Sequence, residues 1–237
     1  MLLGEAVAAG LVVEEVFVDP DSVSRAEIVV AVAEAVDVGA SAWITGDGLR
    51  GLVDVSTPQG VAAVARIPVV AGPAADGSAP LHLVLVGVSD PGNVGTLLRS
   101  AEAVGATVTL CEATVDPWAP KVVRASAGSV LRIPVRSGVV SRVLEEMGDD
   151  GVRLVGTVGT GGRAPDEVDL TGPVALVLGG EAHGLPPHVV ASVDELVSLP
   201  MAGAVESLNV AVAGSVLAFE AVRQRRPDPV QPEAVTR

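Results

Sequence analysis

The hydrophobic positions of this chain follow two spacings in turn, and the alternation predicts a succession of strands and helices. Short runs of Val, Leu and Ile are typical of strands buried in a parallel sheet, whereas apolar residues three or four positions apart are typical of helices. In the first part of the chain, the pattern predicts strands at residues 13–18, 42–45 and 61–67. Between the first two strands it predicts a helix at 24–36, which Ser24 could cap.

The rest of the chain repeats this pattern over a longer distance. Because strands alternate with helices there, we expect a mostly parallel sheet with helices on both faces. The predicted strands are 81–88, 107–111, 153–158, 174–178 and 196–199, and the predicted helices are 93–104, 139–147 and 207–225.

A segment rich in Pro, Gly, Ala and Ser at residues 71–80 has no hydrophobic periodicity and predicts a linker. We therefore expect a small α/β domain at residues 1–72, a linker at 73–80 and a larger α/β domain at 81–226. The Pro-rich residues 227–237 are expected to form a mobile tail.

Composition narrows the class of protein. Hydrophobic residues make up 49% of the 237 positions, which excludes wholesale disorder. No run reaches the ~18 apolar residues of a membrane-spanning helix, and the N-terminus lacks the basic region of a signal peptide. The single cysteine, Cys111, excludes a disulfide framework, and with three histidines we expect no metal site. These features favour a cytoplasmic protein that does not bind membranes.

The chain as a whole is acidic, but one segment of it is basic. The net charge of −14 argues against a strong, nonspecific grip on nucleic acid, and an aromatic content of 2% argues against recognition by stacking on a broad aromatic platform. Within one segment, however, four basic side chains follow one another without an acidic residue between them, and they could bind phosphates or simply be solvated. These residues are Lys121, Arg124, Arg132 and Arg136.

Three loops that follow predicted strands carry the candidate chemistry. In an open parallel sheet, ligands bind beyond the carboxyl ends of the strands. The first loop, DPGNVGT, contains Asn93 and leads into a helix with Arg99. The second, LGGEAHGLP, places Glu181 after two glycines, which permit close backbone approach to a ligand. The third, LPMAGAVESLN, ends with Ser207 and Asn209 at the start of the last predicted helix.

Each loop also has a purely structural interpretation. Asn93, Ser207 and Asn209 could serve as helix caps, and Arg99 could form a solvated pair with Glu102. His183 is expected to be an exposed loop residue rather than a catalytic one. In the last helix, the spacing predicts a buried stripe, which consists of Leu208, Val212, Phe219 and Val222.

Motifs of other enzyme classes are incomplete in this sequence. The phosphate-binding pattern G-x-x-x-x-G-K-[ST] does not occur. Residues 159–164 fit G-x-G-x-x-A, but no convincing helix follows them, as a dinucleotide site requires. Around Ser126, Arg124 occupies the place of the first glycine of a serine-hydrolase elbow.

In this order, the three loops resemble the SpoU (TrmH-type) branch of the SPOUT RNA methyltransferases. The resemblance rests on DPGNVGTLLRSAEAVGA, LVLGGEAHGLPPHV and LPMAGAVESLNVAVAGSVLAFEAVRQR, and it spans roughly residues 81–226. The segment VVRASAGSVLRIPV is similar to the family's connecting region, and residues 1–72 are similar to the ribosomal-protein-like substrate-binding domain often fused there.

The resemblance implies an α/β catalytic domain with a trefoil knot, a homodimer, and transfer of a methyl group from S-adenosyl-L-methionine to a ribose 2′-hydroxyl of structured rRNA or tRNA. It implies catalytic roles for Asn93, Arg99, Glu181, Ser207 and Asn209. Cofactor contacts are implied for Leu178, Gly179, Gly180, Glu181, Leu199, Met201, Ser207, Leu208 and Asn209.

Two features of the sequence refine these implications. Gly180 stands where many relatives carry Asn, so a side-chain contact at that position is lost or supplied elsewhere. Because the first 80 residues contain three basic and 11 acidic side chains, we expect the basic run to carry more of the contact with RNA phosphates. Its members are Lys121, Arg124, Arg132 and Arg136.

Arg99 is an unsuitable general base, since a guanidinium normally stays protonated. We expect it to bind an RNA phosphate and to orient the 2′-hydroxyl. Two alternatives stay open at this point: methylation of a base atom by the same fold, and a catalytically silent protein that binds RNA or the ribosome.

Overall fold

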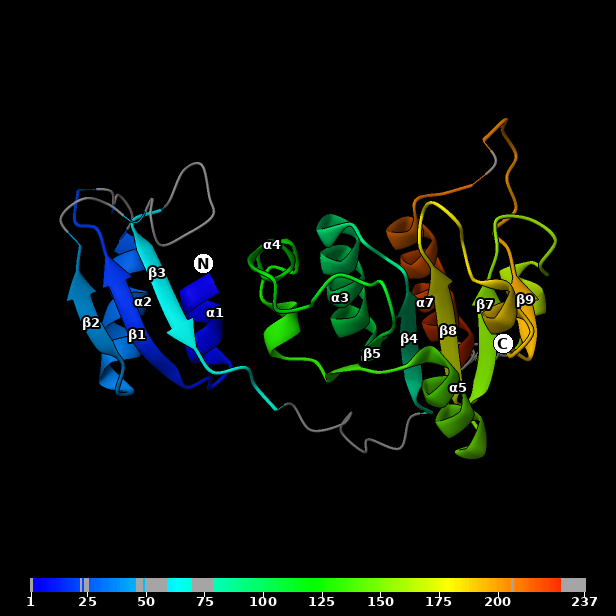
Figure 1. Ribbon diagram of the computed structural model, residues 1–237, viewed down its shortest axis with the longest axis horizontal. Coiled ribbons are helices and arrows are strands. Elements are labelled where there is room, and N and C mark those ends of the chain that lie inside the picture. The colour runs from blue at the N-terminus through cyan, green and yellow to red at the C-terminus, as the bar shows by residue number, and fades with distance from the viewer. Residues whose placement is uncertain are drawn as a thin grey trace, which may run out of the picture.

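The described residues of the computed structural model form two β-sheets, one within residues 13–65 and the other within residues 81–197 (Figure 1). The structure describes residues 2–21, 23, 26–45, 49, 59–69, 79–205 and 207–226. The predicted cap Ser24, most of the predicted linker and the tail at 227–237 lie outside the described residues, so the domain boundaries stay a prediction.

The smaller sheet has three strands and belongs to the N-terminal part. Strand β1 (Val13–Val18) lies in the centre, with β2 (Ser41–Ile44) parallel to it on one side and β3 (Val61–Ala65) antiparallel on the other. Helices α1 (Leu2–Ala8) and α2 (Ala26–Asp37) pack against each other and contribute buried residues to the same core as β1. This confirms the predicted small α/β unit, with α1 added to it.

The larger sheet has six strands, all parallel, in the order β6-β5-β4-β8-β7-β9. Its strands are β4 (Leu81–Val86), β5 (Thr107–Leu110), β6 (Val135–Ser137), β7 (Arg153–Thr157), β8 (Val174–Gly179) and β9 (Glu195–Val197). Its helices are α3 (Pro91–Val104), α4 (Pro120–Ala125), α5 (Val140–Asp149), α6 (Pro187–Val190) and α7 (Val210–Arg225). The predicted parallel sheet is therefore confirmed.

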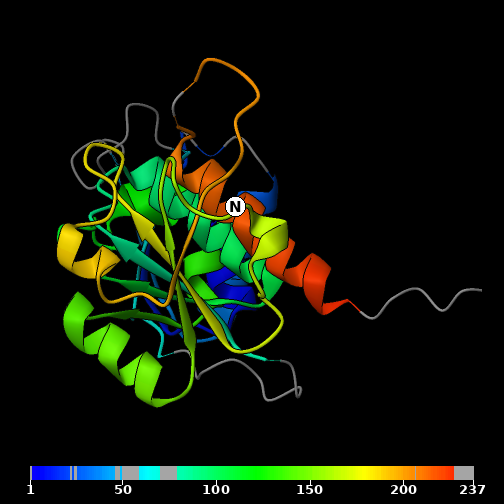
Figure 2. The ribbon, with the colours of Figure 1, turned by 90° about the vertical axis from the view of Figure 1, so that its right-hand side faces the viewer.

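The central strands of this sheet are buried on both faces, because successive side chains point in opposite directions. On β4, Leu83 and Leu85 join the core formed with α3 and α7, whereas Val84 and Val86 join the core formed with α5. Figure 2 shows the sheet between these layers of helices. Continuous Val and Leu runs follow from this double burial.

Helix α7 packs closely on α3 at Gly214. A Cβ at this position would lie 2.6 Å from a methyl carbon of Leu97 and 2.7 Å from one of Leu178, so only glycine permits the approach. The other buried residues of α7 are Val210, Ala211, Leu217, Ala218 and Ala221.

The buried stripe predicted for the last helix is wrong. Leu208, Val212 and Phe219 are 40%, 48% and 51% exposed, and Val222 is only half-buried. The helix is apolar around most of its circumference, so the spacing of large apolar residues does not identify the face that packs. The small residues Ala and Gly occupy that face because they allow α3 to come close.

The elements that the pattern did not predict are short. Helices α1, α4 and α6 and strand β6 contain between three and seven residues each. A helix of seven residues or fewer makes two turns at most, and a three-residue strand is shorter still. Neither is long enough to show a hydrophobic periodicity in the sequence. Within the described ranges, no helix is long and apolar enough to cross a bilayer.

His82 gives the larger domain an expected dependence of stability on pH. Its Nδ1 lies 2.6 Å from Thr107 Oγ1, and burial, followed by the charges of Arg136 and Arg225, lowers its pKa below the usual 6.5. The unfolded chain therefore binds a proton more readily, so the free energy of unfolding should fall as the pH drops below about 6.5.

Urea denaturation between pH 7.5 and 5.5 measures this effect. We expect His82→Gln to flatten the pH dependence relative to the wild type. His188→Gln is the matched control because His188 is exposed on α6, and it should keep the wild-type slope. An unchanged slope in His82→Gln would contradict the assignment.

Candidate functional site

The candidate site lies where the chain reverses its direction across the larger sheet. From β4 the chain proceeds through β5 and β6 towards one edge, and it later returns so that β8 pairs with the other side of β4. A crevice forms at such a switch point outside the carboxyl ends of the strands, where ligands bind. Two of the three loops singled out in the sequence, those after β4 and β8, begin there, and the loop between β9 and α7 lies at the same edge (Figure 1).

A chain of hydrogen bonds joins these three loops. Asn209 Nδ2 donates to Asn93 Oδ1 at 2.9 Å, and Asn93 Nδ2 donates to Glu181 Oε1. Asn209 Oδ1 accepts from the backbone N–H groups of Ala211 and Val212 at 2.9 and 3.2 Å, which fixes the orientation of its amide. We call Asn209, Asn93 and Glu181 the polar relay. The side-chain amides of Asn209 and Asn93 both direct their N–H groups along the relay towards the carboxylate of Glu181.

The start of α3 differs from one sequence expectation. Asp90, not Asn93, caps the helix, because its carboxylate accepts the backbone N–H of Asn93 at 2.9 Å. Pro91 follows at the first helical position, where its missing N–H is harmless. The side chain of Asn93 is thereby left available for Glu181 and Asn209. At α7 the expectation of a cap is confirmed for Asn209.

The two glycines after β8 are required by close backbone contacts. A Cβ on Gly179 would lie 2.3 Å from the carbonyl carbon of Gly184, and one on Gly180 would lie 2.1 Å from the carbonyl oxygen of Gly87. Any larger residue at position 180 therefore requires the loop after β4 to move. This explains physically why this chain has glycine at position 180.

The residues predicted to contact a cofactor are placed differently from one another. Leu178 is fully buried and packs against α7 at Gly214, so its side chain faces the core. Leu199 and Met201 are half-buried in the loop after β9, whereas Ser207 and Leu208 are exposed before α7. The polar relay brings Glu181 and Asn209 together. The cofactor contacts of all these residues, Glu181 and Asn209 included, stay predictions.

Arg99 lies outside the polar relay. It is exposed on α3, six residues after Asn93 and hence about 9 Å further along the helix axis. The alternative of a solvated pair with Glu102 is wrong, because Arg132 binds that carboxylate in a bidentate manner at 2.5 and 3.0 Å. The guanidinium of Arg132 lowers the pKa of Glu102 through this hydrogen bond.

The four basic residues of the connecting region have different environments. Lys121 and Arg124 are exposed on α4, and Arg136 donates to Thr109 Oγ1 at 3.1 Å. Arg132 contacts Glu5 of α1 at 2.5 Å in addition to Glu102. The sequence did not indicate these carboxylate partners, because they are distant in the chain and each is an ordinary solvated acid by pattern. Asp90 could have been recognised from the Asp-Pro pair that begins α3.

Comparisons with known proteins show which family this chain is similar to. The model of the SpoU rRNA Methylase family matches residues 80–219. The 23S rRNA (guanosine-2′-O-)-methyltransferase RlmB of Ralstonia nicotianae is 40% identical over 186 residues, which are 75% of this chain and 74% of that protein. The protein of the same name from Pseudomonas putida is 42% identical over 151 residues, and the match covers 62% of this chain and only 60% of that relative's length.

Solved structures extend the similarity to nearly the whole chain. The AdoMet-bound rRNA methyltransferase from Sinorhizobium meliloti superposes with a TM-score of 0.79 at 27% identity, covering 95% of this chain and 85% of that one. An RNA 2′-O ribose methyltransferase gives a TM-score of 0.78 at 32% identity, covering 93% of this chain and 84% of that one. Both comparisons include the smaller N-terminal part.

Proposed function

Because this chain belongs to the SpoU rRNA methylase family, we propose that it transfers a methyl group from S-adenosylmethionine to a ribose 2′-hydroxyl of structured RNA. The observation that carries the proposal is the polar relay, which joins three separate family motifs at the switch point of the sheet. Ribosomal RNA is the favoured substrate, because the two RlmB relatives described above are named as methyltransferases of 23S rRNA. A cytoplasmic location follows from such a substrate.

The residues at this edge of the sheet fit the methyl donor. Leu199, Met201 and Leu208 offer apolar surface for an adenosine group, and the carboxylate of Glu181 suits the positive charge of a sulfonium. When bound, S-adenosylmethionine supplies an electrophilic methyl group. The full proposed set is Leu178, Gly179, Gly180, Glu181, Leu199, Met201, Ser207, Leu208 and Asn209.

We assign the activation of the ribose to Arg99. Its guanidinium remains protonated, so it holds an RNA phosphate and orients the 2′-hydroxyl rather than removing its proton. A positive charge beside the hydroxyl also stabilises the negative charge that develops on its oxygen as the proton passes to an oxygen of the bound phosphate. Exposure of Arg99 on α3 allows RNA to reach it. Lys121, Arg124 and Arg136 are proposed to bind neighbouring phosphates.

Identification of the methylated nucleoside tests the proposed function. Unmodified 23S rRNA transcript is incubated with the protein and S-adenosylmethionine, digested to nucleosides and analysed by mass spectrometry. We expect a ribose-methylated nucleoside. A base-methylated nucleoside would support the alternative reaction of the same fold, and RNA binding without any methylated product would support the catalytically silent alternative.

We also propose that the chain forms a homodimer through α7. Val212, Val216 and Phe219 form one exposed apolar stripe on this helix and are between 46% and 51% exposed. Exposed apolar stripes of this kind mark protein interfaces. The trefoil knot implied by the family resemblance stays a prediction beside it.

The oligomeric state can be tested with a charge in this stripe. We expect Val216→Asp to convert the dimer into a monomer, because an unpaired carboxylate in an apolar interface costs several kcal/mol, roughly 3–5. Light scattering after size-exclusion chromatography measures the mass. Val29→Asp is the matched control, since Val29 is also an exposed valine on a helix, 59% exposed on α2 against 46% for Val216. A monomeric wild type, or a dimeric Val216→Asp, would contradict the proposal.

A further inference from the structure

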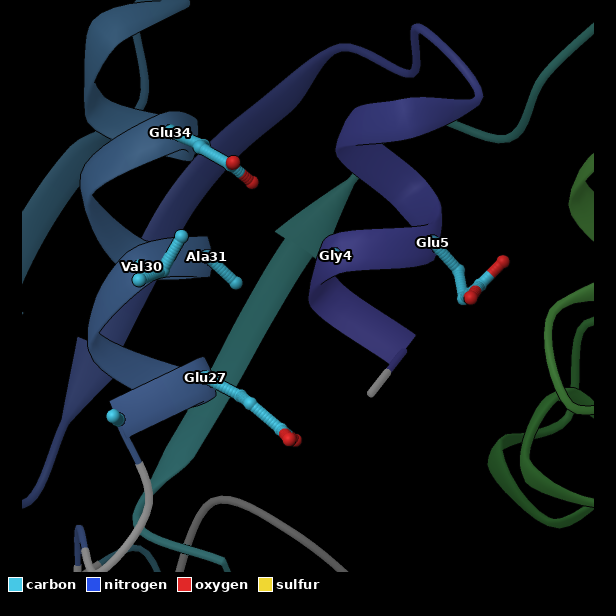
Figure 3. Close-up of a pocket in the computed structure, with 7 residues that line it drawn as sticks. Gly4, Glu5, Glu27, Val30, Ala31 and Glu34 are labelled. Atoms are coloured by element: carbon cyan, nitrogen blue, oxygen red, sulfur yellow. The ribbon is translucent and has the colours of Figure 1, made fainter.

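Helix α1 of the N-terminal part contacts a basic side chain of the larger domain through Glu5. Glu5 Oε2 lies 2.5 Å from Arg132 Nη1, and the same guanidinium binds Glu102 of α3 through Nε and Nη2. Figure 3 shows the side chain of Glu5 directed from α1 towards the larger domain. The loop before Arg132 approaches closely as well, since a Cβ on Gly128 would lie 3.1 Å from Glu5 Cβ.

Glu5 presents an anion to Arg132 in the manner expected of an RNA phosphate. Carboxylates and phosphates are recognised by the same planar fork of guanidinium donors. Glu102 uses Nε and Nη2, so Glu5 holds the remaining side of the fork. A phosphate can therefore replace Glu5 without breaking the bidentate pair with α3.

The position of Arg132 suits a contact near the reacting ribose. Its partner Glu102 lies three residues after Arg99 on α3, about one turn of helix away. Residues three apart lie on the same side of a helix. An RNA strand held at Arg99 would therefore pass close to Arg132.

We propose that Arg132 binds a phosphate of the substrate RNA and that Glu5 occupies this position in the RNA-free protein, so that RNA binding releases α1 from the larger domain. The inference rests on the proposed function, because it takes the substrate to be RNA. Glu27 and Glu34 point towards α1 from α2 (Figure 3), and their charges oppose the approach of RNA to this side of the smaller domain.

The Glu5–Arg132 contact is weak enough to be exchanged. The side chains of Arg132 and Glu5 are 33% and 44% exposed, so water and salt screen their attraction. Exposed ion pairs of this kind contribute little stability, and a phosphate with two acceptor oxygens competes well for the same donors.

Filter binding of unmodified 23S rRNA transcript tests the inference. Glu5→Gln frees Arg132 and should tighten RNA binding by about three- to fivefold, the factor that corresponds to an exposed ion pair of up to ~1 kcal/mol. Glu14→Gln is the matched control, because it removes the same charge from an exposed pair with Arg66 in the same part of the protein. It should change the affinity less than twofold, by about the effect of one distant surface charge.

A double-mutant cycle separates a direct contact from a general effect of charge. In an Arg132→Gln background, Glu5→Gln should no longer change RNA affinity, because the residue that it frees is absent. Equal effects of Glu5→Gln and Glu14→Gln, weaker binding by Glu5→Gln, or an undiminished effect in the Arg132→Gln background would each overturn the inference. If the inference fails in one of these ways but the wild-type protein still binds and methylates the transcript, the proposed function stands. A wild-type protein that neither binds nor methylates it removes both.

Discussion

Replacement of Arg99 by methionine is expected to reduce kcat for RNA methylation by about 100- to 1,000-fold, the usual effect of removing a preorganised charge from a reaction centre. Methionine keeps much of the length and apolar volume of the side chain while removing the charge. Lysine at this position should recover only a small part of the rate, because it restores the charge but not the two-pronged geometry. Initial rates with tritiated S-adenosylmethionine measure both variants.

Two measurements make the Arg99 result specific. Calorimetric binding of S-adenosylmethionine should be unchanged, since Arg99 is exposed about two turns along α3 from the polar relay. Arg142→Met provides the matched control because Arg142 is an exposed arginine on α5, which packs on the opposite face of the sheet. Near-normal turnover of Arg99→Lys would contradict the bidentate contact with phosphate.

The sequence predicted those parts of the fold in which only one arrangement buries the apolar side chains. Strands β4 and β8 are buried on both faces and appear in the sequence as uninterrupted Val and Leu runs. Helix α7 shows the opposite case. Its apolar residues surround it, so the choice of packed face depends on how closely α3 can approach at Gly214, which is a property of the folded pair.

In the candidate site, too, the sequence indicated the positions of the residues but not their contacts. The motifs located Asn93, Glu181 and Asn209, because each follows a strand at the same edge of a parallel sheet. They could not indicate which neighbour each side chain selects. Asp90 takes the capping role expected of Asn93, and that exchange leaves Asn93 available to the relay.

The basic run shows why charge patterns mislead over long distances. Four cations without an intervening acid predicted an open phosphate-binding surface, yet Arg132 is held by carboxylates 30 and 127 residues away in the chain. These partners reach Arg132 only because helices α1 and α3 lie next to it in the fold. No spacing in the sequence indicates this arrangement. At Arg132 the folded arrangement therefore places acidic side chains at a position that the charge pattern predicted to bind phosphate.

Substitution of Asn209 by aspartate is expected to reduce kcat by about 10- to 100-fold, the range associated with a small displacement of reacting groups. Aspartate keeps the Oδ1 acceptor that caps α7 but lacks the Nδ2 donor to Asn93. Asn93 would then face a carboxylate, and its amide is expected to turn away from Glu181. The free energy of unfolding should change by less than ~1 kcal/mol, because aspartate is as good a cap as asparagine.

Comparison with Asn209→Ala separates the two roles of this residue. Alanine removes both the cap and the donor, so it should lose activity to the same extent and also lower the free energy of unfolding by about 1 kcal/mol. Urea denaturation and methylation rates measured on both variants provide the test. If Asn209→Asp retained wild-type activity, the relay would have no part in positioning Glu181, and Asn209 would serve only to begin α7. Equal activity losses with different stabilities would instead show that the relay, rather than the stability of α7, sets the geometry at the switch point.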